Sequence, residues 1–311
     1  GRKLSSEDIA LLHDEHIESL ICAQLEPGDI FEDEAADRIT SLIMGTNLRK
    51  GTASTGRTNI YAGQKGILGF ETEAINGFNS LDEAVTLGLV PPFQHVEKGQ
   101  MIGTLKIIPF AVSGGVMDEI EIFSETHSPL FNLMPYAKKT AILIQTKLTT
   151  TKLSVLDSTA KVTSQRLKVM DGELIDEKRC SHSERELVSE LNTALSSQPD
   201  IILIAGASAI VDRRDIVPSA VELIGGEIIH FGMPVDPGNL LLLASFQNTP
   251  IVGIPGCARS PKLNGFDWVL QRLMAGLAVN GKDIMNMGAG GLLKDIPSRP
   301  LPRAKVSRLG Q

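Results

Sequence analysis

The pattern of apolar and polar positions changes near residue 138. From there to about residue 280, short continuous apolar runs alternate with segments whose apolar residues recur every three to four positions. The first kind of segment predicts buried strands and the second predicts amphipathic helices. The expected strands are TAILIQTKL, ELIDEKRC, IILIA, EIIHF, LLLLASF and PIVGI, and the expected helices are STAKVTSQRLKVM, SERELVSELNTAL, IVPSAVELIG and FDWVLQRLMAGLA. Such alternation is typical of an α/β fold, here a three-layer αβα domain with a mostly parallel sheet.

The preceding part of the chain has a different, mixed pattern. Ser5-Ser6-Glu7-Asp8 is a capping signal before helically spaced apolar residues, which predicts a helix over 4–20. Further helices are expected over 32–44 and over 80–87, where Ser80 and Glu83 would form a capping box. The runs RTNIYA, KGILGF and GQMIGTLKIIPFAV are β-branched and interrupted by glycine, which indicates strands. We therefore expect a mixed α+β region with a β-rich portion.

Length and composition agree with more than one folding unit. The chain has 311 residues, and single cores stop growing near ~250–300 residues. The sequence predicts an accessory domain at 1–138, the αβα domain at 139–285, and a basic, Pro-containing tail or linker at 286–311. Since the chain lacks an initiator Met, we expect it to be a piece of a longer protein.

Charge, aromatic content and cysteines exclude several classes of function. A net charge of −7 and only 4% aromatic residues disfavour a nucleic-acid or anionic-membrane surface. No apolar run approaches the ~20 residues of a membrane span, and we expect no signal peptide. The three cysteines are far apart and odd in number, so we expect no disulfide framework and a cytoplasmic location.

The residues best suited to hold a ligand follow the ends of the predicted strands. In parallel sheets, ligands bind beyond the carboxyl ends of the strands, and free N–H groups at helix starts can hold an anion. Residues of this kind occur near the start of the helix after TAILIQTKL, in the small-residue turn after IILIA, and after PIVGI. The candidates there are Asp157, Ser158, Gly206, Ala207, Ser208, Asp212, Asp215, Pro255, Gly256 and Ser260. The alternative is that Asp157 and Asp215 cap helices and that Gly256 only makes a turn.

Four segments resemble, in the same order, motifs of the molybdopterin-binding domain of molybdenum cofactor biosynthesis. AGAS…RRDIVPSAVELIGG resembles the signature loop of that family, and VLDSTAKVTSQRL its Asp-Ser-Asn helix start. GMPVDPGNLLLL is similar to its Lys-Pro-Gly-Lys segment, and PIVGIPGCARS to its Leu-Pro-Gly-Asn-Pro loop. The family includes molybdopterin adenylyltransferases and molybdopterin molybdotransferases. The segment KLSSEDIALL distantly resembles the accessory part of the molybdotransferases. The resemblance implies a cytoplasmic, molybdopterin-binding domain that forms the N-terminal part of a longer, nucleotidyltransferase-type protein.

The resemblance also implies roles for individual residues. The turn Gly206–Ser208 would hold the terminal phosphate or the pterin, with Pro237 and Gly238 at the second loop. Asp157 and Asp215 would act in adenylylation or metal insertion, as ligands of Mg²⁺ or of the cofactor's polar edge. The sequence departs from the family at four places: the turn has one glycine, about two extra residues precede Asp215, Asp236 and Asn239 replace two lysines, and Cys257 replaces an asparagine.

These departures leave three hypotheses open. The first is a domain that binds molybdopterin, or the molybdenum cofactor, as its small-molecule ligand. The second is an active adenylyl- or molybdotransferase that uses Mg²⁺ and a nucleotide; the missing lysines disfavour it, because they would hold molybdate. The third is a nucleotide-processing or regulatory module on the same fold, or an oligomerisation scaffold. The family relation implies that homo-oligomers and a C-terminal nucleotidyltransferase domain are the expected partners.

Two further groups are weighed against simpler interpretations. His13 and His16 could form a metal pair, but without further ligands nearby in the sequence a solvated helix face is favoured. Cys180 and His182 could form a catalytic pair, but neighbours this close in sequence seldom face each other correctly.

Overall fold

The computed structural model describes residues 4–293, and the chain forms two compact units, Gly1–Tyr136 and Ala137–Gln311. Most of the basic tail expected at 286–311 lies outside the described residues. Among the described residues, no helix is both long and apolar enough to cross a membrane.

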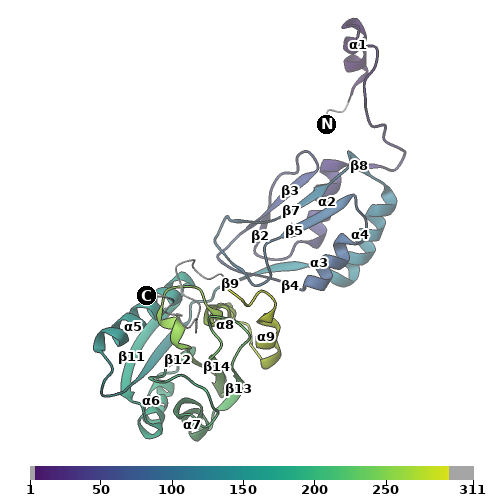
Figure 1. Ribbon diagram of the computed structural model, residues 1–311. Helices are drawn as coiled ribbons and strands as arrows, with labels where there is room; N and C mark the ends of the chain where they lie inside the picture. The colour runs from purple at the N-terminus through teal and green to yellow at the C-terminus, as the bar shows by residue number, and fades with distance from the viewer. Residues whose placement is uncertain (1–3, 294–311) are drawn as a thin grey trace, which may run out of the picture. The chain divides into compact units, whose positions relative to one another are not determined.

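The second unit has an α/β fold around a six-stranded mixed sheet with strand order β11-β10-β12-β15-β14-β13 (Figure 1). The pairs β11–β10, β10–β12 and β12–β15 are parallel, whereas β14 is antiparallel to both of its neighbours. Strand β13 therefore runs in the same direction as β15. The strands are β10 (Thr140–Lys147), β11 (Glu173–Ser181), β12 (Ile201–Ala205), β13 (Glu227–Phe231), β14 (Leu242–Phe246) and β15 (Thr249–Gly253). All six strands occur where the apolar runs predicted them.

Burial explains why β12 forms in the interior of this sheet. Every residue of Ile201–Ala205 is buried, which is typical of a parallel strand covered on both faces. Ile202 and Ile204 belong to a core cluster with residues of α6 (Glu184–Ser196) and α7 (Ile216–Leu223). On the other side of the sheet in Figure 1 lie α5 (Leu153–Val169) and α8 (Gly265–Met274). The short helices α9 (Gly281–Met285), η1 (Gly256–Arg259) and η2 (Asn286–Gly288) complete the unit.

The start of one helix differs from expectation, whereas α7 begins at Ile216 as expected. Helix α5 begins at Leu153, so Asp157 and Ser158 lie in its second turn and not at its start. The reason is that the apolar period extends back to Leu156, which is fully buried. Asp215 is the N-cap residue of α7 but makes no side-chain cap bond. Its Oδ2 instead accepts hydrogen bonds from the backbone N–H groups of Val211 (2.6 Å) and Asp212 (2.9 Å).

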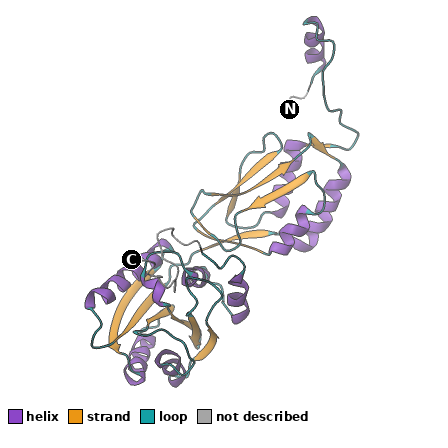
Figure 2. Cartoon of the chain, in the orientation of Figure 1, coloured by secondary structure: helices purple, strands orange, loops and turns teal. Residues whose placement is uncertain are grey.

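The first unit combines small antiparallel sheets with helices, as Figure 2 shows in orange and purple. Its sheets have the orders β2-β3-β7-β5, β6-β4-β9 and β1-β8. The strands are β1 (Ile30–Phe31), β2 (Leu48–Lys50), β3 (Arg57–Ala62), β4 (Gly66–Phe70), β5 (Val85–Leu89), β6 (His95–Val96), β7 (Met101–Ile107), β8 (Ala111–Val112) and β9 (Phe131–Pro135). The helices are α1 (Ser6–Asp14), α2 (Glu32–Ile43), α3 (Thr72–Asn79) and α4 (Gly114–His127), and one cluster of buried residues joins α2, α3 and α4 to the strands.

Two of the helices expected in this unit are corrected. The segment 80–87 is not a helix: Ser80 ends α3, and the following residues form β5, in which Val85 and Leu87 are buried and Thr86 and Gly88 are exposed. This two-residue period is that of a half-buried strand and overrides the Ser80–Glu83 spacing. Helix α1 has the expected Ser5–Asp8 capping box but ends at Asp14, and none of its residues is buried.

Candidate functional site

Three loops at one edge of the α/β sheet surround a cavity of about 500 Å³. They follow β12, β15 and β13, whose carboxyl ends lie at the same edge because these strands run in one direction. This is the edge at which open α/β sheets bind ligands, and the volume is within the usual range of ligand sites, ~300–1,000 Å³. The lining residues are Gly206, Ala207, Ser208, Ala209, Ile210, Asp236, Pro237, Gly238, Asn239, Leu240, Ile254, Pro255, Gly256, Cys257 and Arg259.

The first loop exposes several backbone donors. Within the described part of the chain, the N–H groups of Ser208, Ala209 and Ile210 donate no hydrogen bond, whereas that of Ala207 donates to Thr146 Oγ1 (2.8 Å). A Cβ at position 206 would lie 2.9 Å from the Ser208 carbonyl oxygen, so the tight turn requires glycine there. Consecutive free N–H groups of this kind form an anion-binding concavity.

The second loop depends on Gly238. Its φ is +144°, which favours glycine, and a Cβ there would lie 2.7 Å from the backbone nitrogen of Gly265 at the start of α8. The N–H of Gly265 donates to the Pro237 carbonyl (2.8 Å), so the loop is attached directly to that helix. Asp236 also lines the cavity and contributes a negative charge.

The third loop contains Arg259, the positively charged residue among those that line the cavity. Its Nη2 donates to the Gly206 carbonyl (2.7 Å) and so connects this loop to the first one. Burial lowers the pKa of Arg259 from its ordinary value. Burial also raises the pKa of the neighbouring Cys257 thiol, which keeps it neutral. At Gly256 an added Cβ would meet no atom within 4 Å, so this residue faces open space.

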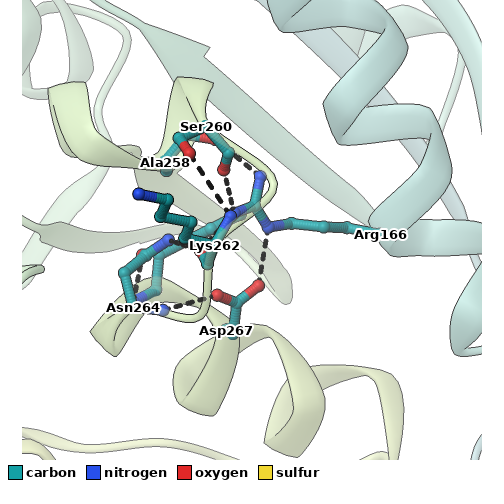
Figure 3. A network of polar contacts seen from close by, with 7 residues as sticks. Arg166, Ala258, Ser260, Lys262, Asn264 and Asp267 are labelled. Carbon is teal, nitrogen blue, oxygen red and sulfur yellow. Dashed lines mark hydrogen bonds and ion pairs between the residues drawn. The ribbon is translucent and has the colours of Figure 1, made fainter. Parts of the chain in front are cut away.

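Arg166 on α5 holds the third loop in place (Figure 3). Its Nε forms an ion pair with Asp267 Oδ1 (2.6 Å), and its Nη1 donates to the carbonyl of Ala258 (2.6 Å). Its Nη2 donates to the carbonyls of Ser260 (2.6 Å) and Lys262 (3.1 Å). Burial raises the pKa of Asp267, and the attraction of Arg166 opposes this shift. One buried guanidinium therefore fixes three carbonyls of the loop.

His182 connects the ends of three neighbouring strands. Its Nδ1 is 2.8 Å from Thr146 Oγ1 at the end of β10, and its Nε2 is 2.8 Å from Ser208 Oγ after β12. Burial lowers the pKa of His182, and the carboxylate of Asp215 opposes this shift. The side chain thus pairs with Thr146 and Ser208, while Cys180 is buried in the core with its pKa raised to about 11 by burial. These contacts disfavour a Cys180–His182 catalytic pair.

The expected site residues divide into two groups. Those that line the cavity are Gly206, Ala207, Ser208, Pro237, Gly238, Pro255 and Gly256. Those outside its lining are Asp157, Ser158, Asp212, Asp215 and Ser260. In the second group, Asp157 pairs with Arg179 Nη2 (2.6 Å), and Asp212 accepts from the backbone N–H of Arg214 (2.8 Å), which lowers its pKa.

The expected metal and catalytic roles of Asp157 and Asp215 stay predictions. Over residues 4–293, no group of three or more His, Cys, Asp or Glu side chains is arranged to hold a metal ion. Sequence reasoning did not identify Arg166 or Arg259 as parts of the site, and it considered His182 only as a partner of Cys180. Arg259 lies directly beside the expected Ser260, but the contacts of Arg166 and His182 bridge segments that no local motif connects.

Comparisons with known proteins add little to this geometry. No protein-family model matches the chain, and no curated protein matches it either. Among solved structures, the chain is similar to the molybdopterin biosynthesis MoeA protein from Pyrococcus horikosii, with 14% identity over 79% of each chain and a TM-score of 0.35.

Proposed function

We propose that the second unit is a three-layer αβα domain that binds molybdopterin in its cavity and serves molybdenum cofactor biosynthesis. The observation that carries the proposal is convergence. Three segments that resemble molybdopterin-binding motifs, far apart in the sequence, all line this one cavity: 206–210, 236–240 and 254–259. Such convergence is not required if the segments are unrelated turns, and it supports a common ligand.

The chemistry of the cavity suits a pterin that carries a phosphate. The free N–H groups of Ser208, Ala209 and Ile210 would hold the phosphate, and Arg259 on the opposite loop would add a positive charge. Asp236 and the Asn239 side chain would accept and donate hydrogen bonds at the polar edge of the pterin. The mixed charge of the lining explains how a chain with a net charge of −7 would bind an anion locally.

The contacts of Asp157 and Asp215 favour ligand binding over transferase chemistry. Asp157 is neutralised by Arg179, and Asp215 uses one oxygen to hold its own loop. Neither residue lines the cavity, so a Mg²⁺-dependent adenylyl transfer would need a rearrangement of both. The lysine pair that would attract molybdate is replaced by Asp236 and Asn239. An active transferase, or a nucleotide-processing module, remains the second candidate.

An equilibrium titration tests the proposal. Purified protein is titrated with molybdopterin under anaerobic conditions, alone and with inorganic phosphate as competitor. We expect saturable binding of one molybdopterin per chain, weakened by phosphate because both compete for the same N–H groups. ATP with Mg²⁺ in place of the pterin provides the comparison. Tighter binding of ATP than of molybdopterin would overturn the proposal in favour of nucleotide processing.

A further inference from the structure

Three side chains from neighbouring strand ends form a hydrogen-bonded chain at the wall of the cavity. Thr146 ends β10, His182 follows β11, and Ser208 follows β12, in a sheet whose order here is β11-β10-β12. The two links, Thr146 Oγ1 to His182 Nδ1 and His182 Nε2 to Ser208 Oγ, are both 2.8 Å long. Ser208 is exposed at the cavity, His182 is half-buried, and Thr146 is fully buried.

We infer that Ser208 is a nucleophile activated by His182, and that the cavity can turn over a small carboxylic ester. A serine hydroxyl within hydrogen-bond reach of an imidazole nitrogen, with that imidazole oriented by a third group, is the arrangement that nucleophilic acyl transfer requires. The inference goes beyond ligand binding and does not depend on molybdopterin being the ligand.

Thr146 provides the orienting group. A hydroxyl oxygen has two lone pairs, so Thr146 Oγ1 can accept from the Ala207 N–H (2.8 Å) and from His182 Nδ1–H at once. We assign His182 the tautomer protonated at Nδ1, in which Nε2 is unprotonated and accepts the Ser208 proton. The opposite tautomer, in which Thr146 donates to Nδ1, would leave Ser208 without a base. The backbone of His182 is fixed as well, because its N–H donates to the Lys147 carbonyl (3.0 Å).

The reaction would proceed in two balanced steps. Ser208 Oγ attacks the ester carbonyl carbon while its proton moves to His182 Nε2; the C–O bond to the alcohol then breaks, and the alcohol leaves with that proton. Water then attacks the acyl carbon while one of its protons moves to the same nitrogen; the bond to Ser208 Oγ breaks, Oγ takes up that proton, and the acid is released. Ala209 and Ile210 also line the cavity, and their backbone N–H groups, which donate no hydrogen bond among the described residues, would stabilise the negative carbonyl oxygen. Arg259 would bind a negatively charged group of the ester.

The charges around His182 define its pH dependence. Burial lowers its pKa, so the neutral base is present at neutral pH, and Asp215 is the carboxylate that opposes this shift. The neighbouring charges are Lys147, at the end of β10, and Glu186 of α6. The Glu186 carboxylate accepts a hydrogen bond from the backbone N–H of Ser181 (2.7 Å). A neutral threonine stabilises an imidazolium less than a carboxylate would, so Asp215 provides the compensating charge.

A fluorophosphonate probe tests the nucleophile directly, because an activated serine displaces fluoride from phosphorus and keeps the adduct. Adduct formation is followed by intact mass and assigned by peptide mapping. We expect one adduct on Ser208, none in Ser208→Ala, and a rate ~10²–10⁴-fold lower in His182→Asn, the usual contribution of a general base. Thr146→Val should slow labelling, whereas Thr146→Ser should not. Ser196→Ala removes an exposed serine of α6 that has no histidine partner among the described residues and is the matched control.

Two further readouts separate catalysis from a structural role. The labelling rate should rise with pH as His182 loses its proton, with a midpoint below the ordinary histidine value of about 6.5, and then stay constant. p-Nitrophenyl acetate should give a burst of nitrophenolate equal to the protein concentration. Melting curves establish that each variant is folded. The inference is overturned if Ser208 is not labelled, if folded His182→Asn is labelled as fast as wild type, or if Thr146→Val is labelled faster. Molybdopterin affinity is measured separately, so failure here leaves the binding proposal intact.

Discussion

Replacing Arg166 should cost far more stability than replacing an ordinary surface charge. The side chain is only 9% exposed, and its partner Asp267 is likewise buried at 8%. In Arg166→Met, Asp267 loses its ion pair and the carbonyls of Ala258, Ser260 and Lys262 lose their donor. Breaking a buried pair by removing one partner costs about 3–5 kcal/mol. We expect a loss of this size in the free energy of unfolding, measured by denaturant titration at pH 7.

The pH dependence gives this prediction a second test. Burial already raises the folded-state pKa of Asp267, and removing the attraction of Arg166 should raise it further. A carboxyl whose folded pKa lies above its unfolded value loses stability as pH rises through that range. The deficit of Arg166→Met should therefore be smaller near pH 4 than at pH 7, and Arg166→Met/Asp267→Asn should lose less than the sum of the two single variants. A loss of unfolding free energy in Arg166→Met that is under ~1 kcal/mol and does not change with pH would refute the stabilising role of Arg166.

Three further predictions concern single residues. Gly238→Ala should lower the free energy of unfolding by about 1–3 kcal/mol, because its φ of +144° and the nearby Gly265 backbone disfavour a side chain; unchanged denaturant midpoints would contradict this. Exposed Cys22 should be alkylated well before Cys180 at pH 8, since a pKa of about 11 leaves only about one Cys180 thiol in a thousand ionised. Timed iodoacetamide labelling with peptide mapping measures the two rates, and equal rates would be inconsistent with a buried Cys180 thiol. Asp215→Asn should weaken molybdopterin binding by about 1–3 kcal/mol, because a neutral amide would hold the Val211 and Asp212 N–H groups less strongly and so loosen the loop that would hold the phosphate; equal calorimetric affinities would contradict a role of Asp215 in ligand binding.

The strand pattern of the second unit could be predicted from sequence because its inner strands, β10 and β12, are almost completely buried. Strands such as Ile201–Ala205 are covered on both faces, so they appear as uninterrupted apolar runs that a turn or a surface helix would not have. The first unit was less predictable. Its strands are short and half-buried, and at 80–87 a local capping spacing competed with the two-residue period of β5, which tertiary packing favoured. Helix α4 was not predicted, because Gly114-Gly115 at its start is typical of a turn.

The candidate site shows the same division between local and non-local information. Gly206 and Gly256 could be identified from small-residue turns after strands, and Gly238 from the resemblance of its segment to a family motif; all three line the cavity. The partners that organise these turns could not be identified in this way. Arg166 contacts residues about a hundred positions later in the chain, and His182 reaches Ser208 past the end of β10, the strand between β11 and β12. Such contacts depend on strand order, which the amino-acid pattern alone does not specify.

Binding of molybdopterin to a variant with a filled cavity tests the central claim most directly. Gly256 lines the cavity, and a side chain added there meets no protein atom within 4 Å, so Gly256→Leu should occupy ligand space without disturbing the fold. Gly88 in β5 is equally exposed and equally free of nearby atoms, which makes Gly88→Leu the matched control. In an anaerobic titration we expect Gly256→Leu to bind molybdopterin at least about tenfold more weakly, or ~1.4 kcal/mol, with an unchanged melting temperature, and Gly88→Leu to bind like wild type. Equal affinities of all three proteins would contradict the assignment of this cavity as the molybdopterin site.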